Sequence, residues 1–155
     1  MTSASPKDVA DVTALLGRPL RGAFFVVVRR TDGDPMVIEN APLLLDGTPM
    51  PTRYWLVDPV IRAEVSQLEA AGGVGEAASA VDPELLAAAH RRYAQERDAL
   101  LPAGRDGPRP SGGVGGTRVG VKCLHAHVAW WLAGGDDPVG AWVAARLGLS
   151  RAPCS

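Results

Sequence analysis

The stretch that decides the fold is AFFVVVRRTDGDPMVI, residues 23–38. Its first part is aromatic and β-branched and too short for a stable helix, so it predicts a buried strand. Asp32 and Gly33 are a strong turn signal, and MVI can return as the second strand of a β-hairpin. Residues 54–57, YWLV, predict a third strand after a loop whose prolines exclude a central strand. We therefore expect a small, mostly antiparallel sheet of about three strands.

Sequence signals for helix starts lie both before and after the predicted strands in the chain. Aspartate followed by proline occurs at residues 58–59, 82–83 and 137–138, each before a helix-like hydrophobic pattern. The Asp side chain can accept a bond from an N–H of the first turn, and proline fits the first helical position because its missing donor has no partner there. A weaker start lies at Ser5, and residues 121–132 repeat apolar side chains at helical spacing. The sequence thus predicts an α+β domain with four to five helices that cover one face of the sheet.

Composition sets the broad class of the protein. The chain of 155 residues, 46% of them hydrophobic, fits one domain with its own core, a Gly/Pro-rich flexible loop at about 104–118, and frayed termini at 1–5 and 150–155. Seventeen acidic against sixteen basic residues leave a net charge of -1, which gives no field to attract nucleic acid. No apolar run approaches the roughly 20 residues that span a bilayer, and no leader is recognisable. We expect a cytoplasmic protein without membrane contact, and a protein partner or a second copy of the chain stays open.

The densest chemical motif is KCLHAH, residues 122–127. The other cysteine, Cys154, is next to the C-terminal residue, so we expect no structural disulfide. On a helix, Cys123 and His127 share a face, whereas His125 is about 160° from Cys123 and reaches the same ion only if Cys123 precedes the first regular turn. A metal needs three or four ligands, so another must come from elsewhere in the chain. Candidates are His90, Asp32, Asp58 and Asp136. A buried cysteine with two hydrogen-bonded histidines explains the same spacing.

A glycine-rich loop, GGVGGTR at residues 112–118, leads into this motif. Such a loop before a helix can present backbone N–H groups to phosphate. The predicted ligand-binding residues are therefore Gly115, Gly116, Arg118 and Lys122. The loop lacks the Gly-Lys-Ser/Thr ending of a P-loop, and a flexible linker has the same composition.

Three blocks carry a family resemblance that spans the chain from Leu16 to Leu147. They are DGTPMPT followed by YWLVDP between residues 46 and 59, the helix end LE at 68–69, and KCLH at 122–125. The chain resembles the uncharacterised bacterial family catalogued as domain of unknown function 501. Relatives typically read Cys-Pro at 58–59 and often Cys-x-Cys-Gly in the hairpin turn, where this chain has RTDG at 30–33.

The resemblance implies that the family cysteines converge with Cys123 and His125 on a metal or redox site. In this chain Asp58, with or without Asp32, would replace the thiolates with oxygen ligands, or the site is lost and the fold retained. A mixed oxygen, nitrogen and sulfur set suits zinc or iron. The resemblance also implies a link to cell division or phosphate metabolism.

Two hypotheses follow for the function. In the first, Cys123, His125, His127 and Asp58 form a small-ligand or metal site beside the glycine loop. In the second, the chain is a non-catalytic interaction or scaffold module, in which these residues pack the helix against residues 54–57. The second hypothesis predicts that His125→Ala lowers stability by about 1 to 3 kcal/mol, because buried partners lose their hydrogen bonds.

Overall fold

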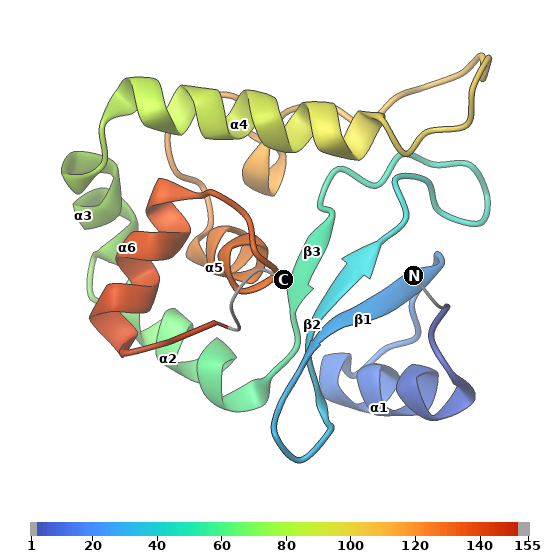
Figure 1. Ribbon diagram of the computed structural model, residues 1–155, viewed down its shortest axis with the longest axis horizontal. Helices are drawn as coiled ribbons and strands as arrows, with labels where there is room; N and C mark the ends of the chain where they lie inside the picture. The colour runs from blue at the N-terminus through green and yellow to red at the C-terminus, as the bar shows by residue number, and fades with distance from the viewer. Residues whose placement is uncertain (1–2, 152–155) are drawn as a thin grey trace.

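The expected β-hairpin is present in the computed structural model, which describes residues 3–151 (Figure 1). Strand β1, Phe24–Arg29, pairs antiparallel with β2, Pro35–Asn40. Gly33 takes the left-handed conformation that the turn requires, with φ of 92°. The third strand, β3, Tyr54–Leu56, adds antiparallel to the other side of β2, so the sheet order is β1-β2-β3. The short antiparallel sheet and the helices around it confirm the predicted α+β class.

All three Asp-Pro pairs begin helices. Helices α2, Pro59–Ala70, α4, Pro83–Asp98, and α6, Pro138–Leu147, each have the aspartate at the N-cap, where its side chain accepts backbone N–H bonds. Helix α1, Pro6–Leu16, begins at Ser5, which forms a reciprocal capping box with the third residue of the helix. Within residues 3–151, no helix has both the length and the apolar character needed to cross a membrane.

One helix was not expected, α3, Gly73–Ala80. The Gly-Gly pair at 72–73 ends α2 but also starts this second helix, because Gly72, with φ of 93°, turns the chain in the left-handed region. Gly73 then passes so close to α2 that a Cβ there would lie 2.6 Å from the carbonyl oxygen of Leu68. The second glycine is therefore explained by close packing of two helices and not by a loop.

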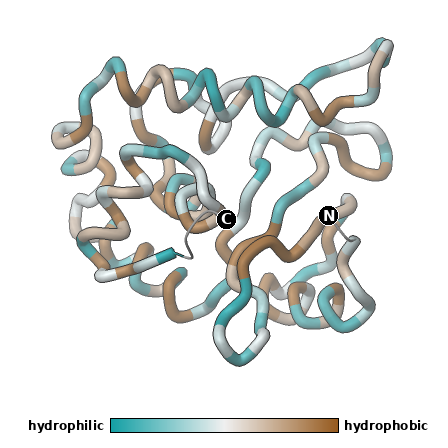
Figure 2. The backbone as a smooth tube through the Cα atoms, in the orientation of Figure 1, coloured by the Kyte–Doolittle hydropathy of each residue, from teal (hydrophilic) through white to brown (hydrophobic). Residues whose placement is uncertain are grey.

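The sheet is covered on both faces, whereas one covered face was expected. Successive residues of β2 point to opposite sides: Val37 joins the large core under the helices, and Ile38 joins a smaller core with Val12 of α1. Helix α5, Leu124–Leu132, packs against β3 within the large core (Figure 1). Hydrophobic residues run almost without interruption along β1 (Figure 2). A strand that is apolar on both sides needs cover on both sides, and α1 supplies the second layer.

The irregular segment between α4 and α5 is held down by two buried side chains of α4. Arg97, which is only 1% exposed, donates to the carbonyl oxygens of Pro51 at 3.1 Å and Gly112 at 2.9 Å. His90 accepts a bond from the N–H of Val114 at 3.1 Å. Its other ring nitrogen donates to the carbonyl of Gly120 at 2.8 Å. The segment, which includes the short 3-10 helix η1, Val114–Gly116, is thus fixed on the surface of α4.

Candidate metal centre

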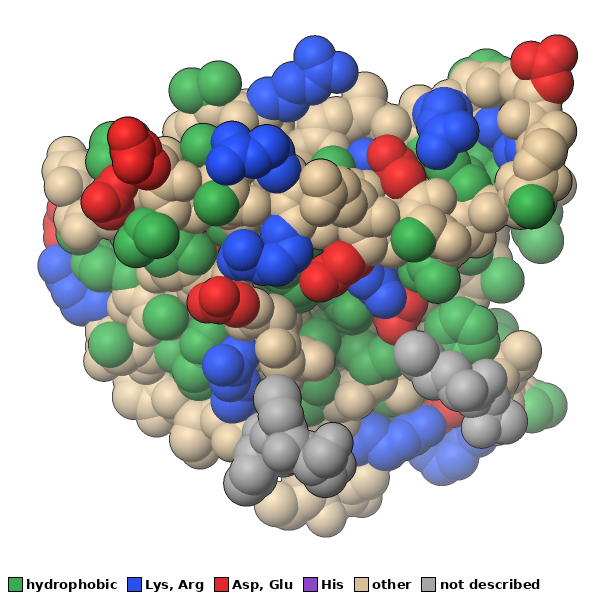
Figure 3. Space-filling view, turned by 45° about the horizontal axis from the view of Figure 1, so that its top comes forward, with side chains coloured by type: hydrophobic (Ala, Val, Ile, Leu, Met, Phe, Trp, Pro, Cys, Tyr) green, Lys and Arg blue, Asp and Glu red, His purple; other side chains and the backbone are tan. Residues whose placement is uncertain are grey.

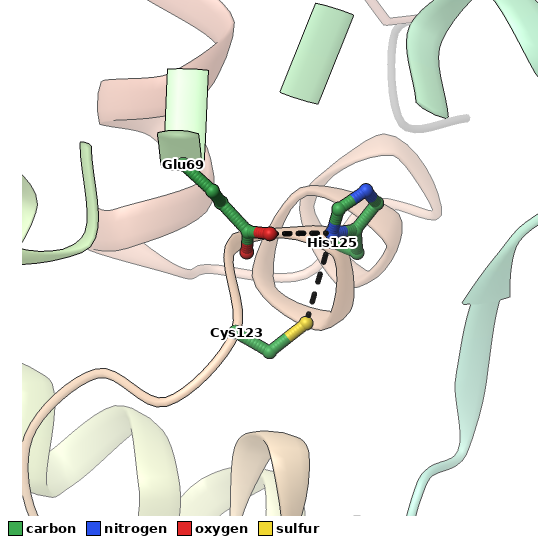
Figure 4. Close-up of side chains that lie close together, drawn as sticks. All are labelled: Glu69, Cys123 and His125. Atoms are coloured by element: carbon green, nitrogen blue, oxygen red, sulfur yellow. Dashed lines mark hydrogen bonds and ion pairs between the residues drawn. The ribbon is translucent and has the colours of Figure 1, made fainter. Parts of the chain in front are cut away.

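Cys123 and His125 meet at the start of α5 (Figure 4). Cys123 is the N-cap residue with an extended backbone, φ -148° and ψ 119°, and the helix begins at Leu124. The 160° separation that a regular helix imposes therefore does not apply to this pair. The Sγ atom of Cys123 lies 3.8 Å from Nδ1 of His125. The condition that the sequence set for a shared ion, with the cysteine ahead of the first turn, is met.

A third side chain, Glu69, joins this pair from the last turn of α2. Its Oε1 atom is 3.3 Å from Nδ1 of His125, and its Oε2 accepts the N–H of Leu124 at 2.8 Å. The three ligand atoms, one each from Glu69, Cys123 and His125, lie within 4.8 Å of one another. Sequence reasoning missed Glu69 as a ligand. The available signal was electrostatic, because a carboxylate in the last turn opposes the helix dipole and needs a compensating partner.

The contacts of Nε2, the second ring nitrogen of His125, determine which nitrogen carries the hydrogen and which has a lone pair available. Nε2 lies 3.3 Å from the carbonyl oxygen of Arg62 and 3.2 Å from the hydroxyl of Ser66. A carbonyl oxygen only accepts, so in the neutral ring Nε2 carries the hydrogen and donates it. The lone pair on Nδ1 then faces both the thiol of Cys123 and the carboxylate of Glu69. Only a proton or a metal ion at this point makes the contact of Nδ1 with two electron-rich groups favourable.

Electrostatics within the cluster favour charged forms. Burial raises the pKa of the Cys123 thiol, but the hydrogen bonds with His125 and with the backbone of Ala126 outweigh it, so this pKa lies below its ordinary value. The hydrogen bond with Cys123 raises the pKa of His125, against the effect of burial, and the carboxylate of Glu69 adds to the rise. In the absence of a metal, both shifts act in the direction of a protonated His125 ring and a Cys123 thiolate.

A pocket opens beside the cluster. Its volume is about 510 Å³, and Cys123, His125 and Ala126 line it together with α2 and the edge strand of the sheet. Three consecutive residues of β3, at 54–56, all line this pocket, although their side chains alternate between the faces of the sheet. The free edge of β3 therefore forms one wall. The space is sufficient for a small molecule next to the three ligand atoms.

The predicted oxygen ligands lie elsewhere. Asp58 is buried at the N-cap of α2, where one carboxylate oxygen accepts the N–H groups of Val60 and Ile61 and the other is 3.6 Å from Nη1 of Arg30. The Nε of Arg30 also lies 3.5 Å from Asp32. The structure thus groups Asp32 and Asp58 around Arg30. Neither aspartate belongs to the Cys123 cluster.

The remaining histidines belong to the core. His127 is fully buried, and its Nδ1–H donates to Asp137 at 2.7 Å, while Asp137 also caps α6. His90 holds the loop on α4. Asp136 is 94% exposed near Arg92. Of the metal-ligand candidates named from the sequence, Cys123 and His125 are the two that meet in the cluster with Glu69, whereas the rings of His90 and His127 contact each other in the core.

The glycine loop divides its residues between two surfaces. Gly115 lines the pocket beside Cys123. Gly116 and Arg118 line a shallow pocket on the other side of the loop with Ser111. Lys122 is exposed. Cys154 and the terminal segments 1–2 and 152–155 lie outside the described residues.

Comparison with known proteins identifies the family of the chain. Residues 26–145 match the model of the family described as protein of unknown function (DUF501). The match covers most of the chain, so the protein belongs to this family. Neither the curated proteins nor the solved structures contain a match.

Proposed function

We propose that the protein binds a transition metal ion, zinc or iron, through Sγ of Cys123, Nδ1 of His125 and Oε1 of Glu69. The observation that supports this proposal is the spacing of these three atoms. In a tetrahedral site with ligand bonds of about 2.0 to 2.3 Å, neighbouring ligand atoms are about 3.3 to 3.6 Å apart. The nitrogen–oxygen distance is 3.3 Å and the sulfur–nitrogen distance is 3.8 Å. These two distances are close to the tetrahedral values, and the sulfur and oxygen atoms lie within 4.8 Å of each other.

The surroundings of the three side chains support this assignment. Metal-binding histidines usually donate their second ring N–H to a carbonyl or carboxylate, which fixes the ring and its tautomer. The carbonyl of Arg62 takes this role for His125. The N–H of Leu124 binds the second oxygen of Glu69 and leaves the first oxygen for the ion. Both contacts orient the ligand atoms before an ion arrives.

Three protein ligands leave a fourth position in a tetrahedral centre. Structural zinc sites are normally closed by four protein ligands, whereas sites that bind or activate a small molecule keep one position open. Cys123 and His125 line the adjacent pocket, so the open position is accessible from it. We therefore favour a centre at which water or a small ligand binds the ion over a purely structural site.

An interaction or scaffold module is the competing function. Helix α5 does pack against the sheet, as that hypothesis requires, and the buried residues Leu124 and Val128 belong to the shared core. Cys123 and His125 remain part of a pocket wall and are only half-buried. The buried residues Leu124 and Val128 explain the packing of α5 without Cys123 and His125. These two residues are therefore better explained by a metal centre than by packing.

Elemental analysis of protein purified without an affinity tag tests the proposal. We expect close to one zinc or iron per chain, and a fall to a small fraction of this in Cys123→Ser, His125→Ala and Glu69→Gln. The glutamine still offers an oxygen to the N–H of Leu124, so this variant removes the ligand charge and keeps the local fold. Asp58→Asn is the matched control and should keep its metal. Wild-type protein that retains no stoichiometric metal after incubation with either ion and gel filtration would refute the proposal.

A further inference from the structure

A further pocket lies between α4 and the irregular segment that follows it. Its volume is about 470 Å³, and four arginines line it. Arg97 is buried beneath it and paired with Asp98, whereas Arg91 of α4 and Arg109 and Arg118 of the segment after α4 are exposed. Ser111 and Gly112 complete this wall. Figure 3 shows basic side chains over α4 and the adjoining loop. Arginines that are far apart in the sequence therefore meet around one hollow.

The positive charge of this pocket is not neutralised by the protein. Within residues 3–151, no carboxylate lies within 4.0 Å of the guanidinium groups of Arg91, Arg109 or Arg118. The one acidic residue in the lining, Asp98, is already paired with Arg97 at 3.1 Å. Three like charges around one hollow repel one another, and a chain with a net charge of -1 has no general excess of cations. A bound anion would relieve this repulsion.

The pocket wall is fixed before any ligand binds. Arg97 and His90 hold the loop on α4 from below, through the carbonyl of Gly112 and the N–H of Val114. Gly112 has φ of 71°, and a Cβ there would lie 2.4 Å from the carbonyl oxygen of Gly116, so only glycine fits this turn. The N–H groups of Ser111 and Gly112 donate to no backbone carbonyl within the described part of the chain. A rigid wall with unused donors lowers the entropy cost of binding an anion.

We propose that this pocket binds a small molecule through a diphosphate group. The planar, forked guanidinium group matches the oxygens of phosphate and binds them with two parallel hydrogen bonds. One phosphate monoester carries about two negative charges, fewer than the three unpaired arginines, so two adjacent phosphates match the pocket better. The pocket is also larger than a diphosphate alone and leaves room for an attached organic group. This site is separate from the proposed metal centre, and its assignment does not depend on that proposal.

Isothermal titration calorimetry on chelator-treated, dialysed protein tests this inference with inorganic pyrophosphate and inorganic phosphate as probes. We expect pyrophosphate to bind at least tenfold more tightly than phosphate, with an affinity that falls as salt is added. Arg91→Gln, Arg109→Gln and Arg118→Gln should each weaken pyrophosphate binding about tenfold or more. All three side chains are exposed, so the variants should fold, which thermal unfolding can verify. Arg21→Gln removes an equal charge elsewhere and should leave the affinity unchanged.

Four results would overturn the inference. Equal affinity for phosphate and pyrophosphate, or unchanged binding in the arginine variants, would show that the pocket does not recognise a diphosphate. Loss of binding in Cys123→Ser with full binding in the arginine variants would place the anion at the other pocket. Binding of a single-stranded oligonucleotide without binding of pyrophosphate would assign the arginines to nucleic acid.

Discussion

Helix α5 carries two histidines only two residues apart, and each lies beside a carboxylate from another part of the chain. His127 is completely buried, and a short 2.7 Å bond joins its Nδ1 to Asp137. His125 is 27% exposed, and its Nδ1 lies between Glu69 at 3.3 Å and the sulfur of Cys123 at 3.8 Å. Nδ1 of His127 therefore has a single partner, the carboxylate of Asp137. Nδ1 of His125 faces two electron-rich atoms, one from Glu69 and one from Cys123, beside a pocket.

The difference shows how the same residue pair can support the fold or form a site. Asp137 divides its two oxygens between His127 and the first turn of α6, so it links two helices inside the core. Glu69 also uses one oxygen on a helix start, at Leu124, but its other oxygen faces Nδ1 of His125. A carboxylate that is fully used by the fold is structural. One with an oxygen left over beside a thiol and an imidazole is a candidate ligand.

The largest expected difference between the two histidines is in stability. His127→Ala leaves the carboxylate of Asp137 buried without its partner and should lower the free energy of unfolding by about 3 to 5 kcal/mol. His125→Ala should cost less than about 1 kcal/mol in metal-free protein, because its partners can bind water. Chemical denaturation of both variants in the presence of a chelator measures the two values. A cost of 1 to 3 kcal/mol for His125→Ala would support the interaction module instead.

A smaller but more specific difference is expected between the titration of His125 and that of His90, the buried histidine of α4. Burial lowers the pKa of His90 below its ordinary value, His127 lowers it further, and the carbonyl of Gly120 and the carboxylate of Asp137 oppose the shift. The pKa of His125 is raised by its contact with Cys123. In metal-free protein, NMR titration of the ring resonances should therefore place His125 above about 6.5 and His90 below it. Indistinguishable titration curves for His125 and His90 would contradict the difference between the half-buried cluster and the core.

These shifts have opposite effects on stability. The folded state disfavours the charged form of His90, so this residue's contribution is present above about pH 6.5 and is lost as the pH falls through its folded pKa. For His125 the folded pKa is raised, so its contribution is present below about pH 6.5 and is lost as the pH rises through the folded value. Unfolding of wild-type protein and of His125→Ala across pH 5 to 8 separates the two.

Local chemistry explains which parts of the fold could be predicted from the sequence. The Asp-Pro helix starts depend on one side chain and the next residue, and all three are correct. The hairpin around Gly33 depends on a turn of a few residues between apolar strands. The position of Cys123 ahead of the first helical turn is also a local matter, because a cysteine just after a glycine-rich segment can lie outside the helix.

The rest depends on contacts between distant residues. Glu69 is 55 residues from the N–H that it binds, and only packing of α2 against the start of α5 brings the two together. The Gly-Gly pair at 72–73 has the same composition as a loop, although Gly73 allows two helices to touch. Nothing in the spacing of Asp32 and Asp58 indicates that Arg30 pairs with both. The identity of the third ligand was therefore not predictable from the motif.

Titration with cobalt(II), which substitutes for zinc and gives an intense absorption band when a thiolate binds it, tests the metal centre most directly. We expect wild-type protein to develop this thiolate-to-cobalt band and saturate at one ion per chain. Glu69→Gln and His125→Ala should bind far more weakly, and Asp58→Asn should match the wild type. No thiolate band in the wild type, or the same band at the same saturation in Cys123→Ser, would contradict the assignment of Cys123, His125 and Glu69 as a metal site.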